Sequence, residues 1–176
     1  MSEPPEVQPS SEPDGVRWVQ GAEFHRGPAQ VHRARPGEPA AVVKRRPDMA
    51  HVVYEPANPN PDAPGWMAGS GAARTVWLAS EQPGSAEGLI PAGLRAAFDT
   101  YLEPGASEGW HQHPESEELY LVLTGELTVR VGDGAPENAA EFVLAPGDTH
   151  RIPVGWWHAA RAGAEGVRFV VVEWHA

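Results

Sequence analysis

Two stretches of the chain decide its fold: Gly105-x5-His111-x-His113-x4-Glu118-x6-Gly125, followed by Gly147-x5-Pro153-x-Gly155-x2-His158. Together they carry three imidazoles and one carboxylate, with the spacing that a small β-barrel needs to direct these groups at one metal ion. The glycines and the proline stand where turns are expected. The two stretches therefore predict a metal site inside a small β-barrel.

The periodicity around these residues explains how their side chains meet. Residues two apart in a strand point to the same face, so His111 and His113 project together if their segment is extended. The run Glu118–Thr124 has the composition of a strand, and His158 belongs to a separate strand, Trp157–Arg161. Two adjacent strands and a distant one converge on one interior point only if the sheet curls, as in a closed or nearly closed barrel.

Other parts of the chain also show strand patterns. Gly125 separates Glu118–Thr124 from the next expected strand, and short turns rich in glycine or proline separate most of the others. The expected further strands are Glu126–Val131, His51–Tyr54, Arg74–Ala79, Arg95–Leu102, Glu141–Ala145, Thr149–Ile152 and Val167–Trp174.

The ligand types indicate a divalent transition metal. Neutral imidazole is the commonest metal ligand in proteins. Three imidazoles with one carboxylate suit Fe(II), Mn(II), Ni(II), Cu(II) or Zn(II), and we expect one such ion, with Fe(II) first among them. The chain has no cysteine, whereas structural zinc sites are closed and usually rich in cysteine. A purely structural zinc site is therefore disfavoured.

These two stretches resemble the two motifs of the cupin superfamily, whose members are small antiparallel β-barrels also called double-stranded β-helices. The resemblance covers residues 95–174 and implies four metal ligands: His111, His113, Glu118 and His158. Glu117 is adjacent to the assigned carboxylate, but the x6 spacing to Gly125 favours Glu118, and Glu117 would point to the opposite face of the strand. One position departs from the family pattern, because Ala162 stands where the second motif often ends with asparagine.

The resemblance implies an all-β fold: a cupin double-stranded β-helix, that is, a jelly-roll-like antiparallel barrel, with an N-terminal extension of strands and loops. Residues 1–15 form an acidic tail that we expect to be disordered, since it has almost nothing to bury. Residues 16–94 then hold the N-terminal extension and the early strands of the barrel, and residues 95–176 form the cupin core with both metal motifs. Within the extension, Ala41–Val43 is expected to be extended, and Pro56–Gly71 to be a long loop that acts as a lid or an interface arm. Ala86–Ala92 is the only helical candidate, and Gly88 and Pro91 oppose it.

Alternation along the strands predicts what surrounds the metal. If Glu118 faces inward, Tyr120 and Val122 do too, and Tyr120 becomes a candidate catalytic group. His150 is a second candidate, as a proton shuttle of the cavity. The alternative for both is that they are ordinary strand residues without a catalytic role. Three aromatic residues are candidates for the cavity wall, which would suit an aromatic or otherwise apolar substrate: Trp77, Phe98 and Phe169. Trp110 and Trp157 are expected to pack outside the barrel or at a dimer contact.

The resemblance implies a metal-dependent enzyme that acts on a small organic molecule, with a dioxygenase-type reaction at the site of three histidines and one glutamate. One alternative is a non-redox isomerase, cyclase or lyase, in which the metal acts as a Lewis acid. The other is a barrel that binds a small molecule without catalysis. A transcription factor is disfavoured, because residues 1–94 show no helix-turn-helix pattern.

Composition limits the partners. The formal net charge of −11 at pH 7 argues against nucleic acid and anionic membranes. No apolar run is long enough to cross a membrane, so a cytoplasmic protein is expected. A homodimer is also expected, and residues 16–60 are the candidate segment for its interface.

Overall fold

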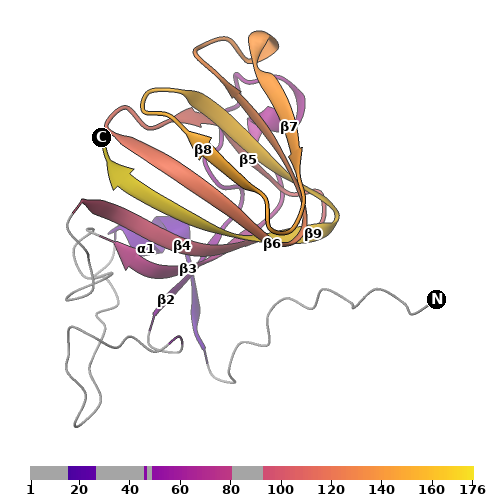
Figure 1. The fold of residues 1–176 in the computed structure, drawn as a ribbon. Coiled ribbons are helices and arrows are strands. Elements are labelled where there is room, and N and C mark those ends of the chain that lie inside the picture. Colours follow the sequence, from indigo (N-terminus) through magenta and orange to yellow (C-terminus); the bar gives the residue numbers. More distant parts are fainter. Residues whose placement is uncertain (1–15, 27–45, 47–48, 81–92) are drawn as a thin grey trace.

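Nine strands dominate the structure, a computed structural model that describes residues 16–26, 46, 49–80 and 93–176 (Figure 1). They are β1 (Trp18–Gln20), β2 (Ala50–Tyr54), β3 (Ala73–Ser80), β4 (Leu94–Leu102), β5 (Ser107–Gln112), β6 (Ser116–Gly132), β7 (Ala140–Leu144), β8 (Thr149–Ile152) and β9 (Trp157–His175). Each expected strand corresponds to one of these elements, with Ala145 just beyond the end of β7, except that Ala41–Val43 lies outside the described residues. The expected tail at 1–15 and the weak helix at 86–92 lie outside them as well.

The two longest strands, β6 and β9, differ from the prediction. The sequence predicts separate strands on the two sides of Gly125, and again at Trp157–Arg161 and Val167–Trp174, but the structure joins each pair into one bent strand. Gly125 has a φ of 78°, and a Cβ added there would lie 2.1 Å from the carbonyl oxygen of Gly166 on β9. This glycine therefore bends the strand without ending it, and the register of the β6–β9 ladder shifts on both sides of it.

The bend lets each half of β6 and β9 join a different layer of the barrel. The first half of β6 pairs with β8 and with the second half of β9, which continues through β4, β3 and β2 to β1. The second half of β6 pairs with β7 and with the first half of β9, whose other neighbour is β5. All of these pairings are antiparallel except that of β1 with β2. The expected all-β antiparallel barrel is confirmed.

The core lies between the two layers. It is built by inward residues from both halves of β6 and β9, together with β4 and β8, and its most buried members include Leu102, Val122, Leu127, Val129, Ile152, Val167 and Phe169. Glu118, Tyr120 and Val122 alternate along β6 and are only 5%, 2% and 0% exposed. The predicted inward face of this strand is therefore confirmed, and it places a carboxylate at the end of an otherwise apolar row.

The segment before the cupin core adds two features to the barrel. Strand β1 runs into a short helix, α1 (Gly21–Arg26), which the sequence does not predict, and Phe24 of this helix packs on Trp77 with ring centroids 4.9 Å apart. The segment 56–71 contains a 3-10 helix, η2 (Gly65–Ala68), whose Met67 is buried against Trp110. Helix η2 of this segment is thus packed on the outside of β5 and β9.

Trp110 and Trp157 belong to a hydrophobic cluster outside the barrel, which also contains Met67 and Ala63. Their rings stack with centroids 6.2 Å apart, and Trp110 is only 3% exposed. The prediction that they face away from the ligand side is confirmed, and the segment 56–71 of the same chain covers them. A second 3-10 helix, η3 (Pro136–Asn138), joins β6 to β7.

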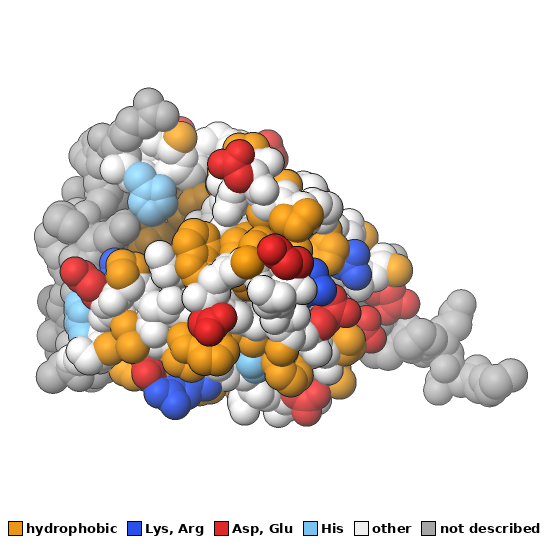
Figure 2. Space-filling view, turned by 90° about the horizontal axis from the view of Figure 1, so that it is seen from above, with side chains coloured by type: hydrophobic (Ala, Val, Ile, Leu, Met, Phe, Trp, Pro, Cys, Tyr) orange, Lys and Arg blue, Asp and Glu red, His pale blue; other side chains and the backbone are white. Residues whose placement is uncertain are grey.

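The outer surface of the molecule is mixed in character. Figure 2 shows acidic side chains spread over one face between patches of hydrophobic side chains. Large hydrophobic side chains that are exposed include Leu121, Leu123, Phe142, Val143 and Trp156. No helix in the described part of the chain has the length and apolar character that a membrane span requires.

Candidate metal centre

Strand register brings the predicted ligands together at one end of the barrel. His111 on β5 is directly opposite His158 on β9, and Glu118 on β6 is opposite Glu173, also on β9. Opposed residues of an antiparallel pair point to the same side of the sheet. His113 follows directly after β5. The three imidazoles each offer a nitrogen, and these nitrogens lie within 4.8 Å of one another.

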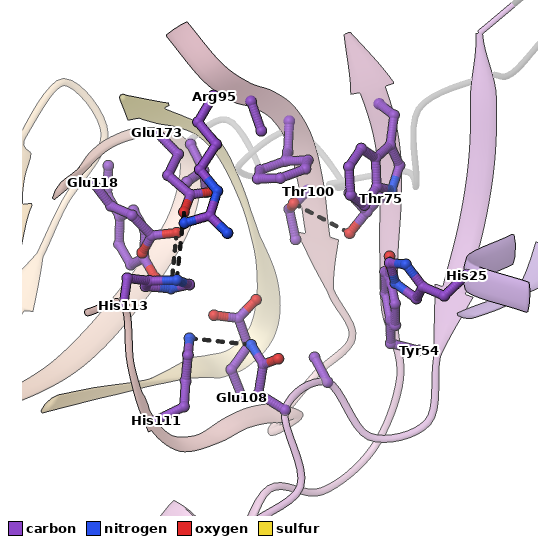
Figure 3. A pocket seen from close by; sticks show the side chains of 17 residues that line it. His25, Tyr54, Thr75, Arg95, Thr100, Glu108, His111, His113, Glu118 and Glu173 are labelled. Atoms are coloured by element: carbon purple, nitrogen blue, oxygen red, sulfur yellow. Dashed lines mark hydrogen bonds and ion pairs between the residues drawn. The ribbon is translucent and has the colours of Figure 1, made fainter. Parts of the chain in front are cut away.

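Glu118 connects the histidines. Its Oε2 lies 3.1 Å from Nε2 of His158, and its Oε1 lies 3.3 Å from Nε2 of His113. The ring of His111 lies 4.1 Å from that of His158, centroid to centroid, and 5.0 Å from that of His113. Figure 3 shows His111, His113 and Glu118 directed into the same cavity. All four residues singled out from the sequence are therefore neighbours.

Several polar atoms of this cluster are buried without a hydrogen-bond partner among the described residues. They are Nε2 of His113, Oε2 of Glu118, and both ring nitrogens of His158. A buried polar atom without a partner is costly, at about 1–3 kcal/mol each. A divalent cation would satisfy the nitrogen lone pairs and the carboxylate oxygen together, so the donor set fits a metal ion.

The electrostatics of the cluster favour the protonation states that a metal requires. Burial, and then the neighbouring His158, lower the pKa of His111 to about 3. For Glu118, burial raises the pKa, but the contact with His158 and the charges of the three histidines outweigh it and bring the pKa to about 2. At neutral pH the His111 ring is therefore uncharged and the Glu118 carboxyl is ionised, which are the metal-binding forms.

Glu173 is a site residue that the sequence reasoning missed. Its Oε1 accepts a hydrogen bond of 2.5 Å from Oγ of Ser116 and lies 3.4 Å from Nδ1 of His113. Nη1 of Arg95 lies 3.3 Å from the same oxygen. Together with His113 and Glu118, Glu173 forms a second group of possible ligand atoms within 4.8 Å. Strand alternation could have identified it, since Glu173 shares the inward face of β9 with Phe169 and Val171.

Glu108 was also missed, for a different reason. It stands three positions before His111, and in a regular strand residues three apart point to opposite faces. A register shift between Glu108 and His111 in the β5–β9 ladder places both side chains on the cavity. Burial, then the charge of Glu118, raises the pKa of Glu108 to about 7. A bulge of this kind has no signal in the residue alternation.

The cavity has a volume of about 300 Å³, and its two sides differ. One side carries His111, His113, Arg95 and three glutamates, and the other carries Tyr54, Thr75 and Thr100, with His25 beside Tyr54 (Figure 3). Trp77 and Phe98, on the same two strands as Thr75 and Thr100, also line the cavity. The rings of Trp77 and Phe98 meet edge to face, 4.6 Å apart. These two were predicted to line the cavity, and they do. The prediction for Phe169 is wrong, because it pairs with Val122, deeper in the core, and is fully buried.

The two catalytic candidates are placed differently. Tyr120 lines the cavity, and burial and the carboxylates of Glu118 and Glu108 raise its pKa well above the usual value, so its hydroxyl keeps its proton. His150 is opposite Tyr120 in the β6–β8 register, but it is not among the residues that line the cavity. Its ring packs on Phe142 with centroids 5.4 Å apart. The structure thus brings Tyr120 to the ligands and leaves His150 apart from them.

Glu117, the residue before Glu118, points away from the cavity, as the sequence predicts. Glu117 faces outward and accepts two hydrogen bonds from the guanidinium of Arg151, one of them 2.9 Å long from Nε. The choice of Glu118 over Glu117 on the inward face is therefore supported by where the two side chains lie.

A curled antiparallel barrel with histidines and carboxylates gathered inside one end is the class of molecule that the fold and the site define. The family model for the cupin domain matches residues 98–173. The resemblance to the cupin superfamily is thus confirmed over residues 98–173.

Known proteins similar to this chain add little about its reaction. An uncharacterized protein of Bacillus subtilis (strain 168), YdbB, is 40% identical over 62 residues, which is 35% of this chain and 50% of that protein. This chain thus matches about half the length of its curated relative. The crystal structure of a protein named as a predicted oxalate decarboxylase, from Thermotoga maritima, has a TM-score of 0.54 at 20% identity, over 77% of this chain and all of the other. Oxalate decarboxylase from Bacillus subtilis has a TM-score of 0.47 at 27% identity, over 60% of this chain and 25% of the other. The Thermotoga structure supports the fold alone.

Proposed function

We propose that this chain is a metal-dependent cupin enzyme acting on a small organic molecule, with one divalent ion held by four residues: His111, His113, Glu118 and His158. One observation carries the proposal: buried nitrogen and carboxylate oxygen atoms without hydrogen-bond partners gather inside one end of the barrel, beside a cavity. Among divalent ions, Fe(II) is our first candidate, and Mn(II), Ni(II), Zn(II) and Cu(II) also suit this donor set.

The cavity lining suits a substrate with an apolar part and a polar part. A volume of about 300 Å³ is at the small end of the range for ligand pockets. Trp77 and Phe98 offer an apolar wall, and the hydroxyl groups of Thr75 and Thr100, 3.2 Å apart, lie next to it. A compact molecule with a planar or apolar part and a polar group toward the histidines fits this lining.

Proton transfer is the chemistry that the residues around the ion support best. A bound divalent ion would supply Lewis-acid stabilisation of negative charge on the substrate. Glu108 projects into the same cavity, where burial and then the charge of Glu118 favour its protonated form, so this carboxyl group is placed to give and take a proton. Tyr120 keeps its proton and can donate a hydrogen bond. We therefore put a lyase, isomerase or cyclase reaction first.

A dioxygenase-type reaction is the second candidate. It is favoured by the number of imidazoles, since three imidazoles and one carboxylate are suitable ligands for Fe(II) and leave coordination positions open for substrate and O2.

Metal analysis and O2 uptake separate these possibilities. Protein purified without chelator, or reconstituted anaerobically with each candidate ion, is expected to hold about one ion per chain. Substoichiometric metal under all of these conditions would sink the proposal. With the ion in place, substrate turnover without O2 uptake supports proton transfer, and equimolar O2 uptake supports the dioxygenase. If the protein binds small molecules from a panel of catechols, β-diketones, hydroxy acids and thiols but converts none of them, it is a binding protein and not an enzyme for these compounds.

A further inference from the structure

The protonation of His111 is fixed by its own backbone. Its Nδ1 lies 2.8 Å from the carbonyl oxygen of Gly109, which can only accept a hydrogen bond. Nδ1 therefore carries the proton, and Nε2 carries the lone pair of the neutral ring. Because Nδ1 is engaged with Gly109, Nε2 is the nitrogen left to bind a metal ion.

Asn58 already contacts that lone pair. Its amide nitrogen Nδ2 lies 3.2 Å from Nε2 of His111 and donates the hydrogen bond. An imidazole nitrogen has one lone pair in the ring plane, so it can accept the Asn58 proton or bind a metal ion, but not both at once.

The backbone around Asn58 holds it against β5. Asn58 has a φ of 46° and is the only non-glycine with a positive φ among the residues that the structure describes. The amide of Gly109 donates to the carbonyl of Ala57 over 3.1 Å, and Nδ2 of Asn60 donates to the carbonyl of Trp110 over 2.7 Å. A Cβ added to Gly109 would lie 2.1 Å from the carbonyl oxygen of Asn58. The segment is thus fixed to the same bulge that carries His111.

We propose that Asn58 caps Nε2 of His111 in the metal-free protein and competes with the ion for that nitrogen, while the bond from Nδ1 to Gly109 keeps the ring in its ligand orientation. This inference rests on the proposed function. Because the backbone on both sides is pinned, the amide group leaves Nε2 by rotating its own side chain while the loop stays in place. The ring is ready to bind the ion, at the cost of one hydrogen bond that the ion must replace.

Asn58→Gly is the suitable variant, because glycine accepts a positive φ without strain. Titration calorimetry with Mn(II) or Co(II) alone should show metal binding that is about fivefold tighter than in the wild type, the effect of removing one net hydrogen bond from the metal-free state. The absorption spectrum of bound Co(II) should not change, because the ligands are the same. Asn138→Gly makes the same substitution in η3, away from the site, and should leave the affinity unchanged.

A second measurement does not need the metal. In the metal-free wild type, ¹⁵N spectra of the imidazoles should show His111 protonated at Nδ1, and Asn58→Gly should move the Nε2 resonance toward that of a nitrogen without a hydrogen bond. An unchanged Nε2 resonance would overturn the inference, and so would unchanged or weaker metal binding in Asn58→Gly. If the wild type binds no metal, the proposed function and the competition both fail, while the Nε2 resonance still decides whether Asn58 caps this nitrogen of His111.

Discussion

At the scale of single residues, the two adjacent glutamates of β6 give the sharpest test of the site. Glu118→Gln keeps the size of the side chain but removes the charge that faces His113 and His158, and we expect it to weaken metal binding roughly a hundredfold or more. Glu117→Gln is the matched control, since this side chain is bound to Arg151 on the outer surface and should leave the affinity unchanged. Equal losses in both variants, measured by titration calorimetry, would contradict the ligand assignment.

The same residues show how far a sequence can specify a site. The spacing of His111, His113 and Glu118 identifies them because the period of a strand decides which side chains share a face. Glu108 is invisible to that reasoning, because a bulge breaks the period between it and His111. Asn58 is invisible for another reason: it comes from a loop far from the motifs, and only tertiary packing brings it to His111.

At the scale of elements, the bend of β6 depends on Gly125. Gly125→Ala puts a Cβ into the left-handed region of φ and against the carbonyl oxygen of Gly166, so we expect it to lower the free energy of unfolding by at least about 2 kcal/mol. Gly134→Ala is the control, because nothing lies within 4 Å of a Cβ added there, and its effect should stay within about 0.5 kcal/mol. Urea unfolding of the two variants measures the difference, and similar stabilities would show that the bend tolerates a side chain.

Strands β4 and β9 are also joined by an ion pair, which predicts a dependence on pH. Asp99 is 7% exposed and accepts hydrogen bonds of 2.8 and 2.6 Å from Arg168, and Arg46 also binds it. Burial raises the pKa of Asp99, but these two arginines outweigh it, so the folded-state pKa lies below the ordinary value. The stability that this carboxylate contributes is therefore complete above its unfolded-state pKa and is lost as the pH falls through the lower folded-state value.

Asp99→Asn should accordingly remove about 1–2 kcal/mol of stability at pH 7, since the arginines that bind Asp99 are themselves partly exposed. The difference between variant and wild type should shrink as the pH is lowered below 4. Unfolding curves from pH 7 to pH 2.5 test this, and a difference that stays constant with pH would mean that the charge of Asp99 does not stabilise the fold.

Element positions were more predictable than element lengths. Short alternating runs such as Arg74–Ala79 and Thr149–Ile152 identify strands β3 and β8 because one of their faces is buried. The continuity of β6 and β9 was not predictable, because a glycine marks a turn and a bend alike, and only the partner strand distinguishes them. Helix α1 has six residues, too few for a periodic pattern, and its Phe24 is stabilised by Trp77 on another element.

At the scale of the whole molecule, the candidate site joins parts of the chain that are far apart in sequence. Its residues come from β5, the residue directly after it, β6 and β9, and β6 and β9 each cross from one layer of the barrel to the other. A ligand bound there would bind only the folded chain, because the unfolded chain does not hold these residues together. Metal binding and folding should therefore be coupled.

This coupling predicts a thermal shift. A free metal concentration a hundred times the dissociation constant adds about 2.7 kcal/mol to the stability of the folded state, which raises the Tm of a chain of this size by roughly 5 to 10 °C. Chelation with EDTA should reverse the shift, and Glu118→Gln, which binds the ion roughly a hundredfold or more weakly, should reduce it to about 2 °C or less at the same metal concentration while unfolding cooperatively. A Tm that is the same with metal and with EDTA, in a wild type that calorimetry shows to bind the ion, would mean that the ion binds the unfolded chain as well as the folded one. A shift that persists in full in Glu118→Gln would show that Glu118 is not a ligand, although its carboxylate contacts both His113 and His158.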